Sequence, residues 1–233
     1  MPLKAAPGRV FRATLRPAFV GARDGVVRML ERRNGISTAG VVELDELGLA
    51  GPDRMRYKPA PWLLLRRALP KRSVSRDDVF IDFGSGMGRV VFQAALHFPF
   101  RRVLGVELSP ELHRIAQGNI DRNRSRFRAQ QVDLVRSDVL DFDIPDDVSV
   151  VFFDNPFTGR IFTEVVDRLL ASVDRAPRRL RIIYFNPVEH EWLMGTGRIE
   201  VIRRVRGLRP GADWARSNSA NVYAVQPGRP AAN

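Results

Sequence analysis

Short apolar runs alternate with helical segments from Val79 onward, and this alternation limits the fold more than any other feature of the chain. A strand, a helix and a second parallel strand connect through a right-handed crossover, so repeated units of this kind build a largely parallel sheet. The last two runs have only a loop between them, which predicts an antiparallel hairpin at the sheet edge. The seven predicted strands contain VFIDF, RVLGVE, QVDLVR, VSVVFF, RLRIIYF, IEVIRRV and ANVYAVQ.

The same pattern divides the chain into a core and two flanking pieces. Residues 1–58 contain one short helical stretch, then Gly and Pro punctuation with little periodicity, so we expect a small cap segment of helical and irregular structure. Residues 59–226 form the predicted α/β domain. Residues 227–233, PGRPAAN, form a tail that we expect to be disordered.

Composition excludes several function classes. The chain has no cysteine and only three scattered histidines, so we expect neither thiol chemistry nor a metal site. No apolar run approaches the roughly 20 residues of a membrane span, and no secretion signal is recognisable, which predicts a cytoplasmic protein without a membrane partner. The net charge of +12 is compatible with a polyanionic partner. However, only three of the 38 basic residues are lysines, and such a skew can also reflect genome composition.

A glycine-rich turn joins the first predicted strand to a helix in the segment VFIDFGSGMGRVVF, residues 79–92. Glycines there allow a tight turn and a close approach of a ligand to the backbone. The helix that follows presents free N–H groups and the positive end of its dipole. The turn carries one carboxylate and three glycines, which are Asp82, Gly84, Gly86 and Gly88.

Two ligand classes use such a turn. A dinucleotide fingerprint starting at Gly84 would need its third glycine at Arg89, where a large cation would oppose close helix–strand packing. The nicotinamide cofactor is therefore disfavoured. Glu107 ends the second predicted strand, where an acid can accept two hydrogen bonds from a ribose diol in either ligand class.

The pattern D-x-G-x-G-x-G resembles the first motif of class I, Rossmann-like methyltransferases, which use S-adenosyl-L-methionine. The resemblance implies that Asp82 holds the methionine moiety, that Glu107 holds the ribose and that Asp138, after the third strand, contacts the adenine amino group. It also implies cofactor contacts at four neighbouring positions, which are Ser85, Leu108, Val139 and Asp154. Each acid has a structural alternative: Asp82 and Glu107 could cap the following helices, and Asp138 could form a turn.

The fourth predicted strand continues directly into Asp154-Asn155-Pro156-Phe157. This segment resembles the (D/N/S)-P-P-(Y/F) motif of amino-group methyltransferases, although Phe157 stands in place of the second proline. We predict a catalytic motif of Asn155, Pro156 and Phe157. In it Asn155 orients a nitrogen nucleophile through its amide oxygen, and Phe157 walls the pocket or stacks on a base. Alternatively, Asn155 and Pro156 simply end the strand and begin a helix.

The segment from about residue 57 to 187 is also similar to the core of histone-lysine methyltransferases of the telomeric-silencing type. The similarity rests on FIDFGSGMGRVV and on the preceding Tyr57-Lys58-Pro59-Ala60-Pro61. It implies that Tyr57 lies against the cofactor or the acceptor, whereas packing of a linker is the alternative. We expect residues 1–58 to cover the acceptor side and to contribute little to cofactor binding.

The sequence thus predicts methyl transfer from S-adenosyl-L-methionine to a nitrogen of a protein side chain or a nucleic-acid base. A small-molecule methyltransferase and a non-catalytic nucleic-acid scaffold that binds the cofactor are the alternatives. Glu189 and His190, after the fifth strand, are further candidate bases, and Trp214 is a candidate acceptor contact. All three also have structural readings, as a solvent-facing helix turn and a loop anchor.

Overall fold

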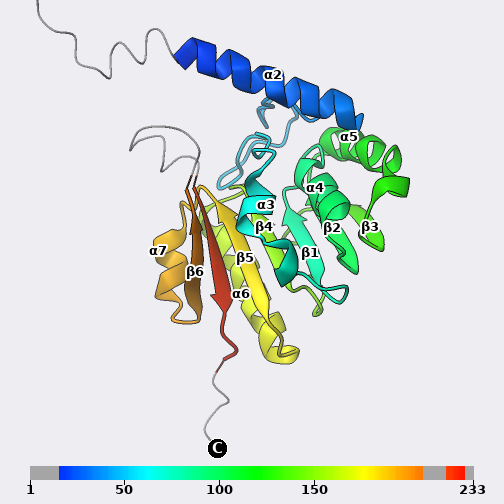
Figure 1. The fold of residues 1–233 in the computed structure, drawn as a ribbon. Coiled ribbons are helices and arrows are strands. Elements are labelled where there is room, and N and C mark those ends of the chain that lie inside the picture. Colours follow the sequence, from blue (N-terminus) through cyan, green and yellow to red (C-terminus); the bar gives the residue numbers. More distant parts are fainter. Residues whose placement is uncertain (1–15, 207–218, 229–233) are drawn as a thin grey trace, which may run out of the picture.

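A seven-stranded sheet forms the centre of the computed structural model, which describes residues 16–206 and 219–228 (Figure 1). The strand order is β3-β2-β1-β4-β5-β7-β6. The residues expected to form the end of the tail, 229–233, and Trp214 lie outside the described residues. The strands are β1 (Val79–Phe83), β2 (Arg102–Glu107), β3 (Gln131–Arg136), β4 (Val150–Phe153), β5 (Leu180–Phe185), β6 (Ile199–Val205) and β7 (Ala220–Val225).

Strands β1 to β5 run parallel, and β7 lies antiparallel between β5 and β6. The predicted mostly parallel sheet with a C-terminal antiparallel hairpin is therefore confirmed. The chain order reverses between β1 and β4, which are neighbours in the sheet. In open α/β sheets a ligand crevice lies beyond the carboxyl ends of the strands at such a reversal.

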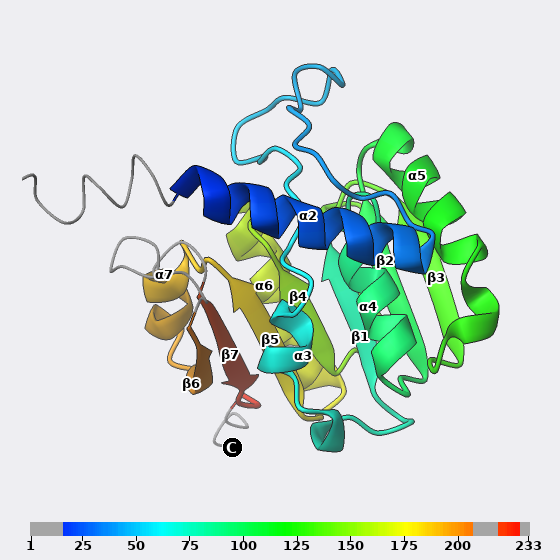
Figure 2. The same ribbon diagram turned by 45° about the horizontal axis from the view of Figure 1, so that its top comes forward.

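Helices cover both faces of the sheet (Figures 1 and 2). One apolar cluster joins α3 and α4 to the sheet through residues such as Leu65, Phe92 and Phe80. A second cluster packs α6 on the opposite face through Phe162 and Leu169. The helical elements are α2 (Arg16–Asn34), α3 (Leu64–Ala68), η2 (Lys71–Ser73), α4 (Arg89–His97), α5 (Pro110–Asp121), η3 (Arg124–Arg126), α6 (Gly159–Arg175) and α7 (His190–Gly195).

Local sequence signals explain where several helices begin and end. The Ser109 hydroxyl accepts a hydrogen bond from Leu112 N at 3.2 Å, and Pro110 occupies the first turn of α5. Helix α2 ends at Asn34, and the φ of 62° at the following Gly35 allows Ile36 N to donate to Glu31 O at 3.1 Å. No helix within residues 16–206 and 219–228 is long and apolar enough to cross a membrane.

The first prediction concerns His97 at the end of α4, whose pKa is lowered from 6.5 to about 4 by burial and by the nearby Arg66, Lys71 and Arg128. Below pH 6.5 the unfolded chain takes up this proton while the folded chain does not. Stability is therefore lost as the pH falls from 6.5 to about 4. Because the imidazole is partly exposed, we expect a loss of about 1 kcal/mol.

Urea unfolding at several pH values measures this effect. His97→Gln has no proton to take up, so its free energy of unfolding should fall less steeply than that of the wild type between pH 6.5 and 4. All other titrating groups are shared by the two proteins and cancel in the difference. Equal slopes would show that His97 is protonated normally in the folded protein.

Candidate active site

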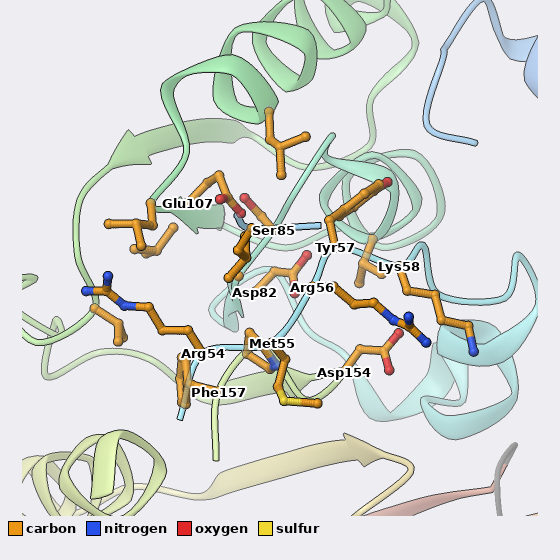
Figure 3. A pocket seen from close by; sticks show the side chains of 18 of the residues that line it. Arg54, Met55, Arg56, Tyr57, Lys58, Asp82, Ser85, Glu107, Asp154 and Phe157 are labelled. Carbon is orange, nitrogen blue, oxygen red and sulfur yellow. The ribbon is translucent and has the colours of Figure 1, made fainter. Parts of the chain in front are cut away.

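A cavity opens at the carboxyl edge of the sheet, beside the point where the strand order reverses (Figure 3). It contains about 920 Å³ of space including its open mouth. Most of the sequence-predicted site residues line it, namely Tyr57, Asp82, Gly84, Ser85, Glu107, Leu108, Asp138, Val139, Asp154, Pro156 and Phe157. The folded chain therefore brings together acids from the ends of four different strands or the loops after them.

The glycine turn can form only because side chains are missing from it. Gly84, Gly86 and Gly88 have φ values of 69°, 54° and 81°, in the left-handed region. A Cβ on Gly84 would lie 2.2 Å from Pro156 Cβ, and one on Gly86 would lie 2.1 Å from Tyr57 Cε2. The turn is thus in direct contact with Pro156, in the segment after β4 that we call the acceptor-side motif (residues 154–158), and with Tyr57.

Glu107 is buried at the end of β2 and braces the turn. Its Oε2 accepts a hydrogen bond from Gly86 N at 2.7 Å, and its Oε1 accepts one from Ser109 N at 2.8 Å. Burial raises the pKa of this carboxyl, and the backbone N–H groups oppose the shift. Each oxygen has a second lone pair for a ligand hydroxyl, so bracing and ribose binding are compatible.

Asp82 and Asp154 are two acids of the pocket that accept no hydrogen bond from any side chain or backbone group within the described ranges. Burial raises the pKa of Asp82 well above its usual value, and repulsion from Asp154 and Glu107 raises it further. Burial also raises the pKa of Asp154 strongly, against the attraction of Lys58. Such a cluster of buried acids is stabilised by a cationic ligand.

Asp138 is already engaged by the chain. Its Oδ2 accepts a hydrogen bond from Arg54 Nη2 at 2.5 Å, and its Oδ1 accepts one from Leu140 N at 3.0 Å. Both side chains of the ion pair are partly exposed, at 29% for Arg54 and 21% for Asp138. An adenine amino group would share this carboxylate with Arg54. No motif or spacing in the sequence points to Arg54, which joins the site only through this tertiary contact.

Residues 53–58, called the strap below, cross the pocket wall. Thr158 N donates to Asp53 O at 2.8 Å and Met55 N donates to Pro156 O at 3.1 Å, so the strap pairs with the acceptor-side motif. The Asp53 carboxylate also accepts from Arg160 N at the start of α6. The expectation that residues 1–58 contribute little to cofactor binding stays a prediction, and the strap carries Arg54 to Asp138 and Tyr57 to Gly86.

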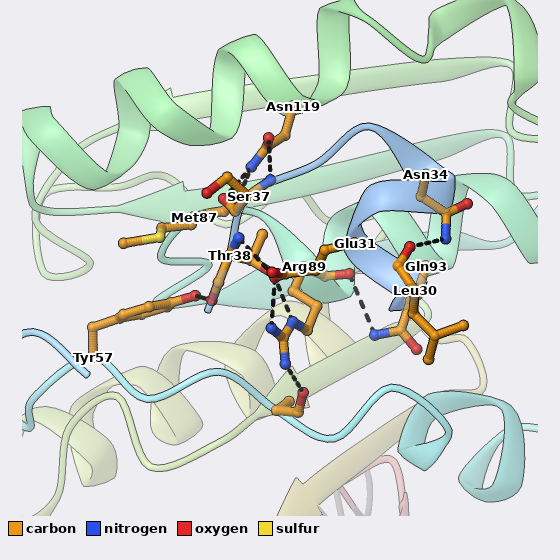
Figure 4. A network of polar contacts seen from close by, with 11 residues as sticks. Leu30, Glu31, Asn34, Ser37, Thr38, Tyr57, Met87, Arg89, Gln93 and Asn119 are labelled. Atoms are coloured by element: carbon orange, nitrogen blue, oxygen red, sulfur yellow. Dashed lines mark hydrogen bonds and ion pairs between the residues drawn. The ribbon is translucent and has the colours of Figure 1, made fainter. Parts of the chain in front are cut away.

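A buried polar network holds Tyr57 and the strap in place (Figure 4). Arg89, at the first position of α4, forms an ion pair with Glu31 of α2 at 2.9 Å and donates to Thr38 Oγ1 at 2.7 Å. The Tyr57 hydroxyl donates to Thr38 O at 2.8 Å. The Arg89 guanidinium also lies 5.4 Å from the Trp62 ring centroid. Arg89 therefore points toward the N-terminal segment, and its size does not disturb helix–strand packing.

Ser85 is the pocket residue with an orphaned polar atom. Its Oγ is buried and has no hydrogen-bond partner among the described residues, so a ligand could supply one. No group of three or more His, Cys, Asp or Glu side chains in the described residues could hold a metal ion.

Asn155 lies at the pocket edge with its side chain turned toward β5. Its Nδ2 donates to Phe185 O at 3.2 Å and to Asn186 O at 2.8 Å, and its Oδ1 accepts from Tyr184 Oη at 2.7 Å. It is not one of the pocket-lining residues. This geometry gives Asn155 a positioning part in the wall, and its direct contact with an acceptor stays a prediction.

The two further base candidates are engaged elsewhere. Glu189 Oε1 accepts from Gly159 N at 2.8 Å, which caps the start of α6. His190 Nδ1 lies 2.9 Å from the Tyr223 hydroxyl oxygen. Neither residue lines the pocket. These contacts therefore favour a structural part for both side chains over a part as a base.

Comparisons with known proteins agree with this geometry. The solved structure of Trm5 from Methanocaldococcus jannaschii in complex with adenosine superposes with a TM-score of 0.51 at 16% identity, covering 74% of this chain and 51% of that one. This likeness concerns the fold, which is that of class I S-adenosylmethionine-dependent methyltransferases. The family model described as histone methylation protein DOT1 matches residues 62–188. The chain therefore belongs to the DOT1 family.

Two curated relatives share part of their sequence with this chain. A protein-lysine N-methyltransferase of Saccharolobus islandicus is 35% identical over 97 residues, which are 42% of this chain and 58% of that protein. The H3 lysine-79 specific histone-lysine N-methyltransferase of Drosophila melanogaster is 34% identical over 83 residues, 35% of this chain and 4% of that protein. The chain thus spans little more than half the length of the first relative and a small part of the second.

The second prediction tests the contact between Gly86 and Tyr57. Gly86→Ala introduces both an unfavourable left-handed alanine and a Cβ that would overlap the Tyr57 ring. Gly35→Ala is a matched control, because its φ of 62° carries the same backbone penalty and a Cβ there meets nothing within 4 Å. We expect Gly86→Ala to lose about 1–3 kcal/mol more stability than Gly35→Ala in urea unfolding.

Tyr57→Ala, alone and combined with Gly86→Ala, completes a double-mutant cycle. If the overlap is the cause, the excess loss should largely disappear in the Tyr57→Ala background. An unchanged excess would mean that Tyr57 does not pack on the turn in solution.

Proposed function

We propose that this protein transfers a methyl group from S-adenosyl-L-methionine to an amine nitrogen of a protein side chain. One observation carries the proposal: a left-handed glycine turn and four acids, Asp82, Glu107, Asp138 and Asp154, line one pocket at the carboxyl edge of the sheet. Membership of the DOT1 family and the protein-lysine methyltransferase among the relatives favour a protein acceptor.

The pocket residues fit the proposed cofactor. S-adenosyl-L-methionine supplies an electrophilic methyl group on a positively charged sulfonium, and it also carries an ammonium group and a ribose diol. We infer that Asp82 and the glycine turn hold the methionine part and that Glu107 accepts from the ribose hydroxyls. Asp138 and Val139 contact the adenine, and Arg54 shares the Asp138 carboxylate with the adenine amino group. Ser85 and Leu108 contact the remaining cofactor surface. The buried, mutually repelling acids support this assignment because a cation relieves their repulsion.

The acceptor side is assigned to the wall after β4. Pro156 and Phe157 line the pocket together with Met55 and Ile161, and this apolar surface fits an alkyl chain. Asn155 positions the wall through its contacts with β5. Catalysis here consists mainly of holding the nitrogen in line with the methyl group and excluding water. A nucleic-acid base or a small molecule as acceptor, and binding without turnover, are the alternatives that the experiments below separate.

We also propose a division of the chain into a cap segment at 1–58, a methyltransferase domain at 59–226 and a tail at 227–233. The contacts of Arg54 and Tyr57 support a part for the cap in cofactor binding as well as in the acceptor wall. A cytoplasmic location is proposed because the reaction needs a supply of S-adenosyl-L-methionine.

The third prediction is that the protein binds S-adenosylmethionine and S-adenosylhomocysteine, and does not bind NAD, in isothermal titration calorimetry. Glu107→Ala removes two charge-assisted hydrogen bonds to the ribose and should weaken cofactor binding by about 2–3 kcal/mol. Glu111→Ala is the control, because Glu111 lies in the first turn of α5 and does not line the pocket. Binding of NAD without binding of S-adenosylhomocysteine would refute the assignment.

The acceptor class is tested separately by incubating the protein and methyl-labelled S-adenosylmethionine with cell extract. We expect the label to enter material that protease degrades and nuclease does not, because the pocket and the relatives favour a protein amine. Label that only nuclease releases would favour a nucleic-acid acceptor, and label in small molecules would favour the small-molecule alternative. Cofactor binding without transfer to any fraction would indicate a non-catalytic protein.

A further inference from the structure

Asp154 is the polar side chain that the end of β4 presents to the pocket. It follows Phe153 directly and lines the cavity, where Figure 3 shows its carboxylate. The next residue, Asn155, does not line the cavity, and its side chain is hydrogen-bonded to Tyr184 of β5 and to Asn186 just after that strand. The two neighbouring side chains thus point in different directions. The Asn155 amide is hydrogen-bonded within the pocket wall, and the Asp154 carboxylate lines the cavity.

The charged groups around Asp154 come from two other elements. The carboxylate of Asp82, in β1, repels that of Asp154, so a positive charge nearby would stabilise the pair. Lys58 of the strap attracts Asp154. Arg56 of the strap lines the same cavity, but its guanidinium pairs with Glu43 at 2.9 Å. The carboxylates of Asp82 and Asp154 therefore share this part of the pocket with the basic side chains of Lys58 and Arg56. Arg56 is already paired with Glu43.

The apolar rim beside Asp154 defines what kind of cation can reach it. Met55 lines the cavity and is 44% exposed, and Ile161 and Phe157 lie in the same lining. An alkyl chain can pack on these side chains while its charged end meets the carboxylate. A primary alkylammonium group has this combination of an apolar stem and a charged head.

We propose that Asp154 is a catalytic residue, which binds the ammonium form of the acceptor and takes its proton before methyl transfer. The proposal rests on the function proposed above. In the first step one N–H bond of the ammonium breaks and an O–H bond forms on Asp154, leaving a neutral amine. The nitrogen lone pair then forms the N–CH₃ bond as the C–S bond breaks, and its electron pair goes to sulfur. Asp154 afterwards releases its proton to water.

Such a base is well suited to the step because burial raises the pKa of the Asp154 carboxyl, against the attraction of Lys58, so that it holds a proton more readily than a carboxyl in water. Asp154→Asn keeps the shape and a hydrogen-bond acceptor but cannot take a proton. Asp154→Glu keeps the carboxylate and should retain part of the function. Glu189→Gln is the matched control, since Glu189 lies after β5 near the same sheet edge and caps α6 without lining the pocket.

The first experiment needs no identified acceptor. Calorimetry measures n-butylammonium binding to protein saturated with S-adenosylhomocysteine, with 1-butanol as the uncharged probe. We expect Asp154→Asn to weaken n-butylammonium binding at least tenfold and to leave 1-butanol binding unchanged. Glu189→Gln should resemble the wild type. Equal n-butylammonium affinity in wild type and Asp154→Asn would overturn the proposal, even if methyl transfer is real.

The second experiment measures single-turnover methyl transfer to lysine-containing peptide between pH 6 and 10. Asp154→Asn should be about 10²-fold slower near pH 7, the scale of general base catalysis. The deficit should shrink as the pH approaches the amine's own pKa of about 10.4, because the acceptor then loses its proton unaided. A deficit that is constant with pH would mean that Asp154 has only a structural part. Wild-type protein that binds n-butylammonium through Asp154 but transfers no methyl group would refute the proposed function and the proton transfer, and would leave only the ammonium-binding role of Asp154.

Discussion

The close approach of other chain segments to the glycine turn is the constraint on which the rest of the site depends. Gly84 and Gly86 have no Cβ, so Pro156 and the Tyr57 ring can pack where side chains would otherwise stand. This contact joins three regions that are far apart in the sequence, namely the strap, the turn after β1 and the motif after β4. The buried ion pair between Arg89 and Glu31 fixes the same arrangement from behind, through Thr38 and the Tyr57 hydroxyl.

The second organising principle is a group of acids gathered in one pocket of a positively charged protein. The chain carries a net charge of +12, yet its pocket gathers acids whose burial raises their pKa values, and repulsion from Asp154 and Glu107 raises the pKa of Asp82 further. Placing such acids together costs free energy in the empty protein, and a cationic ligand or acceptor relieves that cost. The charges that act on a bound ligand are therefore those of the pocket side chains, and the net charge of the whole chain does not predict them.

The fold was predictable because its signals are local. Alternating strands and helices need only hydrophobic periodicity, and the handedness rule for crossovers leaves few topologies for such a chain. The acids after β1, β2 and β3 were predictable as pocket residues for the same reason, because parallel strands end at one edge. Arg54 was not predictable, since its ion pair with Asp138 depends on a strap with little periodicity. The orientations of Asp154 and Asn155 were equally hidden, because adjacent residues at a strand end differ only in which way the turn points them.

The sequence by itself determined a mostly parallel sheet, the position of the glycine turn and the order in which acids follow the strands. These features depend on residue type and spacing along one stretch of chain. The tertiary structure decided which side chains face the cavity, that the strap forms part of its wall, and that Arg89 is buried against Glu31 and Trp62. Those outcomes depend on contacts between segments that are far apart in the sequence. Which of these contacts form is decided only when the whole core packs.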